Sequence, residues 1–476
     1  MNLSLLCDFY EFTMGNGYFL AGKQEEISCF DLYFRRVPDD GGFAIMAGIP
    51  EMIEYLQNLT FSKEDIAFLR AKNLFCEPFL QYLQNFQFTC DVYAVPEGTP
   101  VFPNEPIVSV KGPAVQAQLL ETMLLLIINH QTLIATKSNR IVRAAQGRPV
   151  FEFGSRRAQG YAAAVLGARA SYIAGCSGTA CTVCEQKYGI PAVGTMAHSW
   201  IQMFDSELEA FKAYAQFYPD NCTLLIDTYN VLKSGVPNAI RTYQQVLAPL
   251  GKRLQGVRID SGDITYLTKC VRTMLDEAGL TDCKIMVSNS LDEYIIQDIL
   301  AQGAKVDCFG VGERLITSRS EPVFGGVYKL VAAENNGQLE PKIKFSENSG
   351  KITTPCLKKV YRLFSKQTGK MVADLIALYE ETFDFSSPIT LFDPVHTWKR
   401  KTFEDYAVQE LLKPIFLGGK LVYQSPTLEQ TRLYCVQEVG KLWEEILRFE
   451  NPQEYYVDLS QKLWDIKQAL LRKNGK

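Results

Sequence analysis

Residues 149–200 read PVFEFGSRRAQGYAAAVLGARASYIAGCSGTACTVCEQKYGIPAVGTMAHSW. Short apolar runs at 150–153, 172–174 and 191–194 predict three strands, with helical segments between them. The first strand ends at a glycine followed by two arginines, and the third runs into a threonine and a histidine. Parallel α/β sheets and barrels carry their chemistry at the carboxyl ends of the strands. This stretch therefore predicts a polar site at one end of a sheet.

The same alternation continues downstream and indicates an α/β fold. Further strands are expected at 223–227, 255–259, 284–288 and 305–309, with helices such as 263–278 and 291–302 between them. Strands separated by helices predict parallel pairing, and about seven such units favour a barrel over a doubly wound sheet. No G-x-G-x-x-G motif opens a helix after the first strand, which weakens a dinucleotide-binding interpretation.

The rest of the chain divides around this α/β region. Residues 1–115 predict a β-rich N-terminal domain, and alternating residues at 335–390 are expected to complete it, so that this domain is discontinuous in sequence. Residues 116–330 form the expected barrel domain. Residues 391–476 are expected to be mainly helical.

Composition narrows the class of protein. The 476 residues need two or three domains, and the net charge of −4 provides no basic field for nucleic acid. The most apolar run, 119–128, is too short to span a bilayer and predicts a buried helix, so no membrane partner is expected. No signal peptide is visible, and the 13 scattered cysteines fit reduced thiols in a cytoplasmic protein. Cys181 and Cys184 have metal-ligand spacing but lack a second pair, which argues against zinc.

Several residues at the expected strand ends are candidates for a site that binds an anion. Arg156 and Arg157 can fork onto phosphate or carboxylate oxygens, although a surface pair making ordinary salt bridges has the same pattern. His198 lies between small polar neighbours and suits a general base, a metal ligand, a nucleophile or a structural histidine.

Carboxylates follow two neighbouring strands. Asp227 ends one strand, and Asp260 and Asp263 follow the next. Such groups bind ribose hydroxyls, hold Mg2+ or stabilise a cationic transition state, whereas helix capping, for which Ser261 is a candidate, is the alternative. Later strand ends supply hydroxyl and amide groups or a backbone cradle for phosphate: Ser288, Asn289, Gly310 and Gly312.

The combination of these motifs resembles the nicotinate phosphoribosyltransferase family. The matching stretches run in family order: LCDFYEFTM (6–14), FGSRRAQG (153–160), GTMAHS (194–199), GVRIDSGD (256–263) and GGVYKLV (325–331). The resemblance implies an irregular α/β barrel joined to a β-rich domain, working as a homodimer with its active site near the interface. It also implies synthesis of nicotinate mononucleotide and pyrophosphate from nicotinate and phosphoribosyl pyrophosphate, coupled to ATP hydrolysis with Mg2+, as the first step of NAD salvage from nicotinic acid.

The resemblance assigns roles to individual residues. His198 takes the position of the family's phosphohistidine. The nicotinate contacts fall on Tyr10, Thr195 and Arg258, with Arg157 also at the anionic site, and the N-terminal tyrosine of such proteins is thought to reach a site across the dimer interface. Arginines and Mg2+ then stabilise the leaving pyrophosphate, while the strand-end aspartates stabilise the ribosyl cation or position its hydroxyls.

One departure from the family pattern stands out. Gly310-Val311-Gly312 is followed by Glu313 and Arg314 where G-[VI]-G-T is expected, so either Arg314 or backbone amides alone must receive a phosphate. The rival interpretations are a nicotinamide- or quinolinate-using relative of the same fold, a sugar-phosphate aldolase or isomerase, and a catalytically silent ligand sensor. Arg258 and the R-R-A-Q-G motif favour nicotinate.

Overall fold

The computed structural model describes residues 2–474, and the chain folds as two compact units. Unit 1 comprises Met1–Leu133 and Val323–Lys476, and unit 2 comprises Ile134–Pro322. Unit 1 is therefore built from two segments that are far apart in sequence. Residues 116–133, expected in the barrel domain, belong to unit 1, where Thr122 binds the N-terminal helix.

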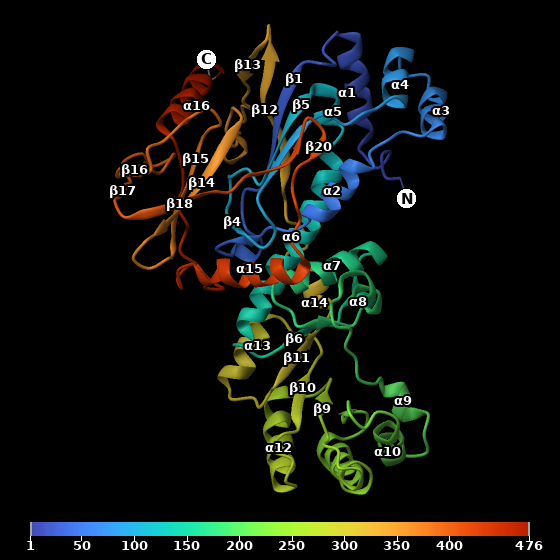
Figure 1. Ribbon diagram of the computed structural model, residues 1–476. Helices are drawn as coiled ribbons and strands as arrows, with labels where there is room; N and C mark the ends of the chain where they lie inside the picture. Colours follow the sequence, from blue (N-terminus) through green and yellow to red (C-terminus); the bar gives the residue numbers. More distant parts are fainter. Residues whose placement is uncertain (1, 475–476) are drawn as a thin grey trace. The chain divides into compact units, whose positions relative to one another are not determined.

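A parallel sheet forms the framework of unit 2 (Figure 1). Its order is β7-β6-β11-β10-β9-β8, and every neighbouring pair is parallel. The strands are β6 (Val150–Glu152), β7 (Gly178–Thr179), β8 (Thr223–Leu225), β9 (Gly256–Ile259), β10 (Lys284–Val287) and β11 (Cys308–Val311). The helices are α7 (Tyr161–Ile173), α8 (Thr182–Tyr188), α9 (His198–Gln202), α10 (Glu207–Phe217), α11 (Val236–Thr242), α12 (Ile264–Glu277), α13 (Glu293–Ala301) and α14 (Glu313–Ile316).

The expected barrel is not closed. Residues 191–194, expected to be a strand, meet the sheet through a single bridge between Thr179 and Ala192. Within the described residues no strand pairing joins this segment to β8, so the ring stays open there. The expected strand at 172–174 is also wrong, because these residues end α7 and the chain reaches β7 only after the turn at Gly175, whose φ is 115°.

Antiparallel sheets dominate unit 1. A seven-stranded sheet has the order β13-β12-β1-β5-β3-β19-β20, so strands of the N-terminal segment pair with strands of the C-terminal one (Figure 1). Its strands are β1 (Ile27–Tyr33), β3 (Asp91–Ala94), β5 (Val108–Pro113), β12 (Val327–Asn335), β13 (Gln338–Pro341), β19 (Lys413–Leu417) and β20 (Lys420–Leu421). A second sheet has the order β18-β14-β15-β21, and two pairs complete the unit, β2 with β4 and β16 with β17.

The remaining elements of unit 1 bear on two expectations. Residues 335–390, expected to complete the N-terminal domain, lie in unit 1 with it, and there β14 (Lys358–Ser365) and β15 (Met371–Leu378) form a second sheet with β18 (Tyr406–Glu410) and β21 (Val457–Leu459). Residues 391–476 are not mainly helical, because the strands β16 to β20 precede the two helices, with a tight turn at Gly418 and Gly419 joining β19 to β20. The other elements are α1 (Phe9–Leu20), β2 (Ala44–Ile45), α2 (Ile49–Gln57), α3 (Lys63–Ala71), α4 (Glu77–Gln84), β4 (Pro100–Val101), α5 (Ala114–Gln118), α6 (Glu121–Ala144, which continues into unit 2), β16 (Ile389–Phe392), β17 (Arg400–Phe403), α15 (Leu428–Gly440) and α16 (Gln461–Asn474).

A buried arginine connects the strands of unit 1. Arg362 on β14 is fully buried, and its Nε and Nη2 donate to the carboxylate of Asp374 on β15 at 2.9 and 2.6 Å. Its Nη1 donates to the carbonyl oxygen of Pro100 at 2.8 Å, and the Tyr455 hydroxyl donates to Asp374 at 3.0 Å. Removing one member of such a pair leaves a buried charge without compensation, so the cluster requires all its partners.

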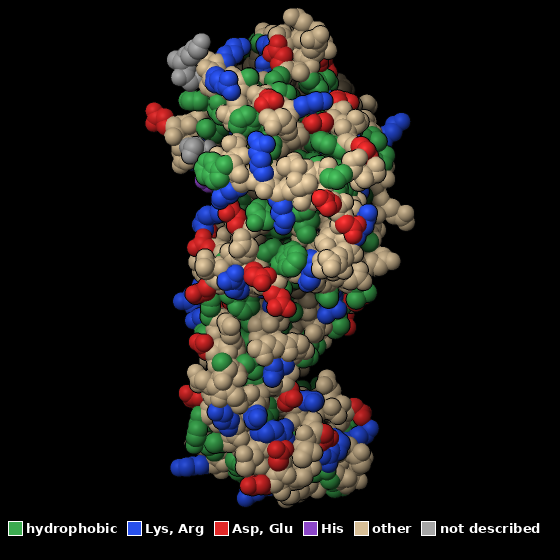
Figure 2. Space-filling view, turned by 90° about the vertical axis from the view of Figure 1, so that its left-hand side faces the viewer, with side chains coloured by type: hydrophobic (Ala, Val, Ile, Leu, Met, Phe, Trp, Pro, Cys, Tyr) green, Lys and Arg blue, Asp and Glu red, His purple; other side chains and the backbone are tan. Residues whose placement is uncertain are grey.

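The most apolar helical stretch of the described residues is mostly buried. Ala114–Ala144 is the one helical stretch in residues 2–474 long and apolar enough to cross a membrane, and 67% of its most apolar window is buried in the fold. Figure 2 shows Lys and Arg side chains interspersed with Asp and Glu over the face in view, which agrees with the small net charge of −4.

Glu11 anchors α1 to α6 and carries a titratable charge into the core of unit 1. One carboxylate oxygen accepts hydrogen bonds from the backbone N–H and the hydroxyl of Thr122 at 3.1 and 2.5 Å, and the other is buried without a partner. Burial raises the pKa of Glu11 from 4.5 to about 7, against the lowering effect of the Thr122 hydrogen bonds. The protonated form is therefore the one that the fold prefers.

We expect this carboxyl group to make stability fall as the pH rises. A folded-state pKa above the unfolded value gives a stabilisation that is complete below about 4.5 and is lost as the pH rises through about 7. Glu11→Gln, which mimics the protonated form, should remove that part of the pH dependence, measured as the free energy of unfolding between pH 4.5 and 7.5. Glu25→Gln on the surface is the control, and parallel profiles for wild type and Glu11→Gln would contradict the assignment.

Candidate active site

A cavity of about 520 Å3 lies in unit 2 at the carboxyl ends of β6, β9, β10 and β11. Five arginines and two carboxylates line it, which makes the cavity strongly cationic in a chain whose net charge is −4. The lining residues are Phe153, Ser155, Arg156, Arg157, Ala180, Val193, Gly194, Thr195, Arg258, Asp260, Ser288, Asn289, Ser290, Gly310, Gly312, Glu313, Arg314 and Arg319.

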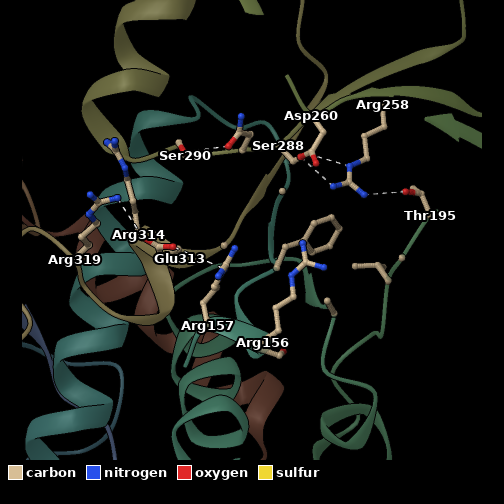
Figure 3. A pocket seen from close by; sticks show the side chains of 18 residues that line it. Arg156, Arg157, Thr195, Arg258, Asp260, Ser288, Ser290, Glu313, Arg314 and Arg319 are labelled. Carbon is tan, nitrogen blue, oxygen red and sulfur yellow. Dashed lines mark hydrogen bonds and ion pairs between the residues drawn. The ribbon is translucent and has the colours of Figure 1, made fainter. Parts of the chain in front are cut away.

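Arg258 is held by polar groups from three segments of unit 2 (Figure 3). Its Nε donates to the Ser288 hydroxyl at 2.9 Å, its Nη1 to the Thr195 hydroxyl at 3.2 Å and its Nη2 to Oδ1 of Asp260 at 3.2 Å. The Ser288 hydroxyl donates in turn to the same oxygen of Asp260. The guanidinium carbon lies 5.7 Å from the centre of the Phe153 ring. The network fixes the plane of the guanidinium group at the wall of the cavity.

A second group of contacts links the aspartates at neighbouring strand ends. Oδ2 of Asp227 accepts hydrogen bonds from the backbone N–H of Asp260 at 2.9 Å and from the Ser261 hydroxyl at 2.6 Å. Asp227 is only 8% exposed, and its Oδ1 is buried without a hydrogen-bond partner. Mg2+ in proteins commonly takes one or two carboxylates and completes its coordination with waters and substrate phosphates. The orphaned oxygen of Asp227 fits that kind of metal site.

His198 begins α9 beside this group. Its Nδ1 lies 3.0 Å from the Thr228 hydroxyl, and its Nε2 lies 3.9 Å from Oδ2 of Asp260. The side chain is 41% exposed, so the imidazole is accessible as well as oriented. The partners are a hydroxyl and a carboxylate, so the alternative of a structural histidine bonded to a carbonyl oxygen does not fit these contacts.

The arginine pair sits in the turn after β6, within the short 3-10 helix Ser155–Arg157. Arg156 and Arg157 are exposed and line the cavity. In Figure 3, Arg258, Asp260 and Thr195 occupy one side of the cavity, and Arg157 lies with Glu313, Arg314 and Arg319 on the other.

Glycines allow the ends of β6 and β11 to approach closely. A Cβ on Gly310 would lie 2.6 Å from the Phe153 ring, and one on Gly154 would lie 2.6 Å from Cβ of Ile316. A Cβ on Gly312 would lie 3.1 Å from the Phe153 carbonyl oxygen. Gly310 and Gly312 line the cavity, as expected. The close packing of the Phe153 ring is already enough to require a glycine at position 310, whether or not a phosphate binds there.

Two further constrained features lie at the ends of the strands beside the cavity. Glu152 at the end of β6 is buried, accepts a hydrogen bond from the Thr179 hydroxyl at 2.6 Å and ties β6 to β7; burial raises its pKa, against the effect of its hydrogen bonds. Asn289 and Ser290, after β10, both have positive φ values of 84° and 44°. Two consecutive non-glycine residues in that region are uncommon and mark a backbone held by its surroundings.

The structure brings most of the predicted site residues together. Arg156, Arg157, Thr195, Arg258, Asp260, Ser288, Asn289, Gly310 and Gly312 all line the cavity. Asp227 and His198 do not line it but contact Asp260. Asp263 caps α12 by accepting a hydrogen bond from the Tyr266 N–H at 2.7 Å, so Asp263 rather than Ser261 is the helix cap. Tyr10 lies on α1 in unit 1 and is 42% exposed.

Arg319 was missed by sequence reasoning. It follows α14 in a turn and has no strand or motif beside it, so no sequence signal separates it from a surface arginine. Its Nη1 donates to Oε1 of Glu313 at 3.2 Å.

The arrangement suits a substrate that carries several negative charges. Arginine side chains bind phosphate and carboxylate oxygens in pairs, and they are more effective in a cavity than on an open surface. The carboxylates of Asp227 and Asp260 lie beside these arginines and suit the stabilisation of a positive centre in the substrate.

Comparison with known proteins agrees with this chemistry. The chain matches three family profiles: the nicotinate phosphoribosyltransferase (NAPRTase) N-terminal domain over residues 5–129, the nicotinate phosphoribosyltransferase (NAPRTase) family over 149–375, and the nicotinate phosphoribosyltransferase C-terminal domain over 357–467. It is similar to a nicotinate phosphoribosyltransferase of Bacillus subtilis, with 43% identity over 98% of this chain and 94% of the relative. A nicotinate phosphoribosyltransferase of Mycobacterium tuberculosis is 38% identical over 94% of this chain and 89% of the relative.

A solved structure shows the same fold. The crystal structure of human nicotinic acid phosphoribosyltransferase matches with a TM-score of 0.87 at 28% identity, covering 98% of this chain and 99% of that one. The profiles and the relatives extend over nearly the whole sequence, including both segments of unit 1. The chain therefore belongs to the nicotinate phosphoribosyltransferase family.

Proposed function

We propose that this enzyme transfers the phosphoribosyl group of phosphoribosyl pyrophosphate to nicotinate and forms nicotinate mononucleotide and pyrophosphate, a step of NAD salvage. The observation that carries the proposal is the fixed guanidinium of Arg258 in a cavity lined by four further arginines. One arginine is oriented for a planar carboxylate, and the others are available for phosphates.

Arg258 is suited to the carboxylate of nicotinate. A guanidinium group has five N–H donors, and three of those of Arg258 are engaged by Ser288, Thr195 and Asp260. Among the described contacts, one N–H on each Nη is left for an incoming carboxylate, which is the bidentate geometry. Nicotinamide has no charge to match this group, so the site should reject it. Phe153 offers an aromatic face beside the same guanidinium.

The reaction needs stabilisation of charge rather than a strong base. The lone pair of the pyridine nitrogen forms the bond to the anomeric carbon, and the electrons of the breaking carbon–oxygen bond leave with pyrophosphate. Arg156 and Arg157 would bind the leaving group. Asp227 and Asp260 would stabilise the positive ribosyl centre or hold Mg2+, which when bound supplies positive charge to the pyrophosphate oxygens.

His198 would be phosphorylated by ATP as a co-substrate. Its Nε2 would attack the terminal phosphorus, and ADP would leave with the electrons of the broken P–O bond. Three observations support this role: the ring is 41% exposed, Thr228 engages its Nδ1, and Asp260 lies near its Nε2. A histidine so placed connects ATP use to Asp260, which contacts Arg258.

We also propose that the enzyme works in the cytoplasm as a homodimer in which Tyr10 serves the active site of the partner copy. Tyr10, Phe9 and Met14 on α1 are exposed apolar side chains, at 42%, 47% and 38%, which suits a buried place in an assembly. Sedimentation of the purified protein tests this assembly, and a monomer at micromolar concentration would contradict it.

The substrate assignment predicts a specific kinetic loss in Arg258→Gln. Product formation from phosphoribosyl pyrophosphate and Mg2+ is measured with nicotinate or nicotinamide, each with and without ATP. Wild type should yield nicotinate mononucleotide and use nicotinamide poorly, whereas Arg258→Gln should raise KM for nicotinate roughly 100-fold because a charge-assisted bidentate pair is lost. Arg241→Gln, an exposed arginine on α11, is the matched control. Preferential turnover of nicotinamide by wild type would overturn the assignment.

The ATP coupling predicts a different loss in His198→Ala. This variant should keep slow phosphoribosyl transfer but lose the increase in yield that ATP gives, because no nitrogen remains to accept phosphate. The assay measures the formation of nicotinate mononucleotide with and without ATP, and the release of ADP when ATP is present. His396→Ala, a 47% exposed histidine of unit 1, serves as the control. Full ATP stimulation in His198→Ala would refute the phosphohistidine.

A further inference from the structure

Glu313 occupies the position between two of the cavity's arginines. Its Oε1 accepts a hydrogen bond from Nη1 of Arg319 at 3.2 Å, and its Oε2 lies 3.8 Å from Nε of Arg157 (Figure 3). Glu313 begins α14, directly after the Gly310-Val311-Gly312 turn, and lines the cavity. The carboxylate therefore contacts both arginines from within the space where a substrate phosphate would bind.

Arg314 does not take the place of the missing threonine. Its Nη1 donates to Oδ2 of Asp292, and its side chain is 28% exposed, against 15% for its partner. The charge of Arg314 is thus largely matched by Asp292. Arg314 also lines this side of the cavity, but Asp292 is its partner, whereas Glu313 compensates Arg157 and Arg319.

An anion that enters this side of the cavity must compete with Glu313. Arg157 and Arg319 are each 61% exposed, so each ion pair is worth little in water and can be broken by a ligand with more negative charge. A pyrophosphate group carries several charges and accepts several hydrogen bonds, whereas a carboxylate carries one charge. Exchange of the carboxylate for the phosphate keeps the two arginines compensated in both states.

We propose that Glu313 is a positioning residue that acts as an internal counter-anion, which Arg157 and Arg319 exchange for the pyrophosphate group of the substrate and recover when the product leaves. This inference rests on the proposed function and extends it. Glu313 holds the arginines in place in the empty site, lowers the affinity of the site for pyrophosphate and so favours release of that product.

A neutral residue in place of Glu313 should make pyrophosphate bind modestly more tightly. Replacing Glu313 with a neutral residue removes one negative charge from the cavity and releases two arginines for the ligand. Because both pairs are exposed, we expect the dissociation constant of pyrophosphate to fall about three- to tenfold rather than by orders of magnitude. A merely structural role for Glu313 would give weaker binding instead.

The test is calorimetric titration of inorganic pyrophosphate, with Mg2+ present, into the full-length protein. The variants are Glu313→Gln, Glu313→Thr, which introduces the hydroxyl expected from the sequence pattern, and Glu313→Asp, which keeps the charge. Glu277→Gln, an exposed carboxylate at the end of α12, controls for the loss of one charge elsewhere in unit 2. We expect tighter binding in the first two variants, near wild-type binding in Glu313→Asp and no change in Glu277→Gln. An unchanged or weaker affinity in both neutral variants would overturn the proposal.

Two further readouts separate the possible failures. In steady-state kinetics Glu313→Gln should lower KM for phosphoribosyl pyrophosphate and should not raise kcat, because tighter product binding slows release. In the background of Arg319→Gln the effect of Glu313→Gln should shrink, since one of the two exchanged partners is gone. Wild type that does not bind pyrophosphate at all would contradict the proposed function itself, whereas binding that is indifferent to Glu313 would contradict only this inference.

Discussion

The arrangement of the site depends on the hydrogen bonds of one guanidinium group. Arg258 projects from β9, and its partners are Ser288 directly after β10, Asp260 directly after β9, and Thr195. Side chains of parallel strands meet at the same edge of a sheet, so a short polar residue at each strand end is enough to surround the arginine. The same contacts orient Asp260, which in turn connects to Asp227 and approaches His198.

A second constraint is the close approach of β6 and β11. Phe153 donates its backbone N–H to the Val311 carbonyl at 2.8 Å, and glycines at 154 and 310 leave room for the Phe153 ring and Ile316. This packing sets the spacing between the arginine pair after β6 and the Glu313–Arg319 pair after β11. The cavity is therefore shaped by backbone proximity as well as by charge, and larger side chains at these glycines would alter it without touching a polar group.

Local patterns predicted the parts of the site that lie directly after strands. Arg156, Arg157 and Asp260 follow short apolar runs, Arg258 lies within the last of these runs, and the structure places all four around one cavity. The opening of the ring beside residues 191–194 depends on long-range contacts and was not predictable in this way. The pairing of Arg319 with Glu313 spans only six residues, but it lies in a turn that no sequence motif marks. The strand expected at 172–174 failed because a short apolar run satisfies both helical and strand patterns, and the small residues before it continue the helix.

The most direct test of this account is a crystal structure of the protein with nicotinate mononucleotide bound. The account predicts that the carboxylate on the pyridine ring lies within hydrogen-bond distance of both Nη1 and Nη2 of Arg258, while Thr195, Ser288 and Asp260 keep their contacts with the guanidinium group. A ring carboxylate bound by another arginine, with the surroundings of Arg258 unchanged, would contradict it.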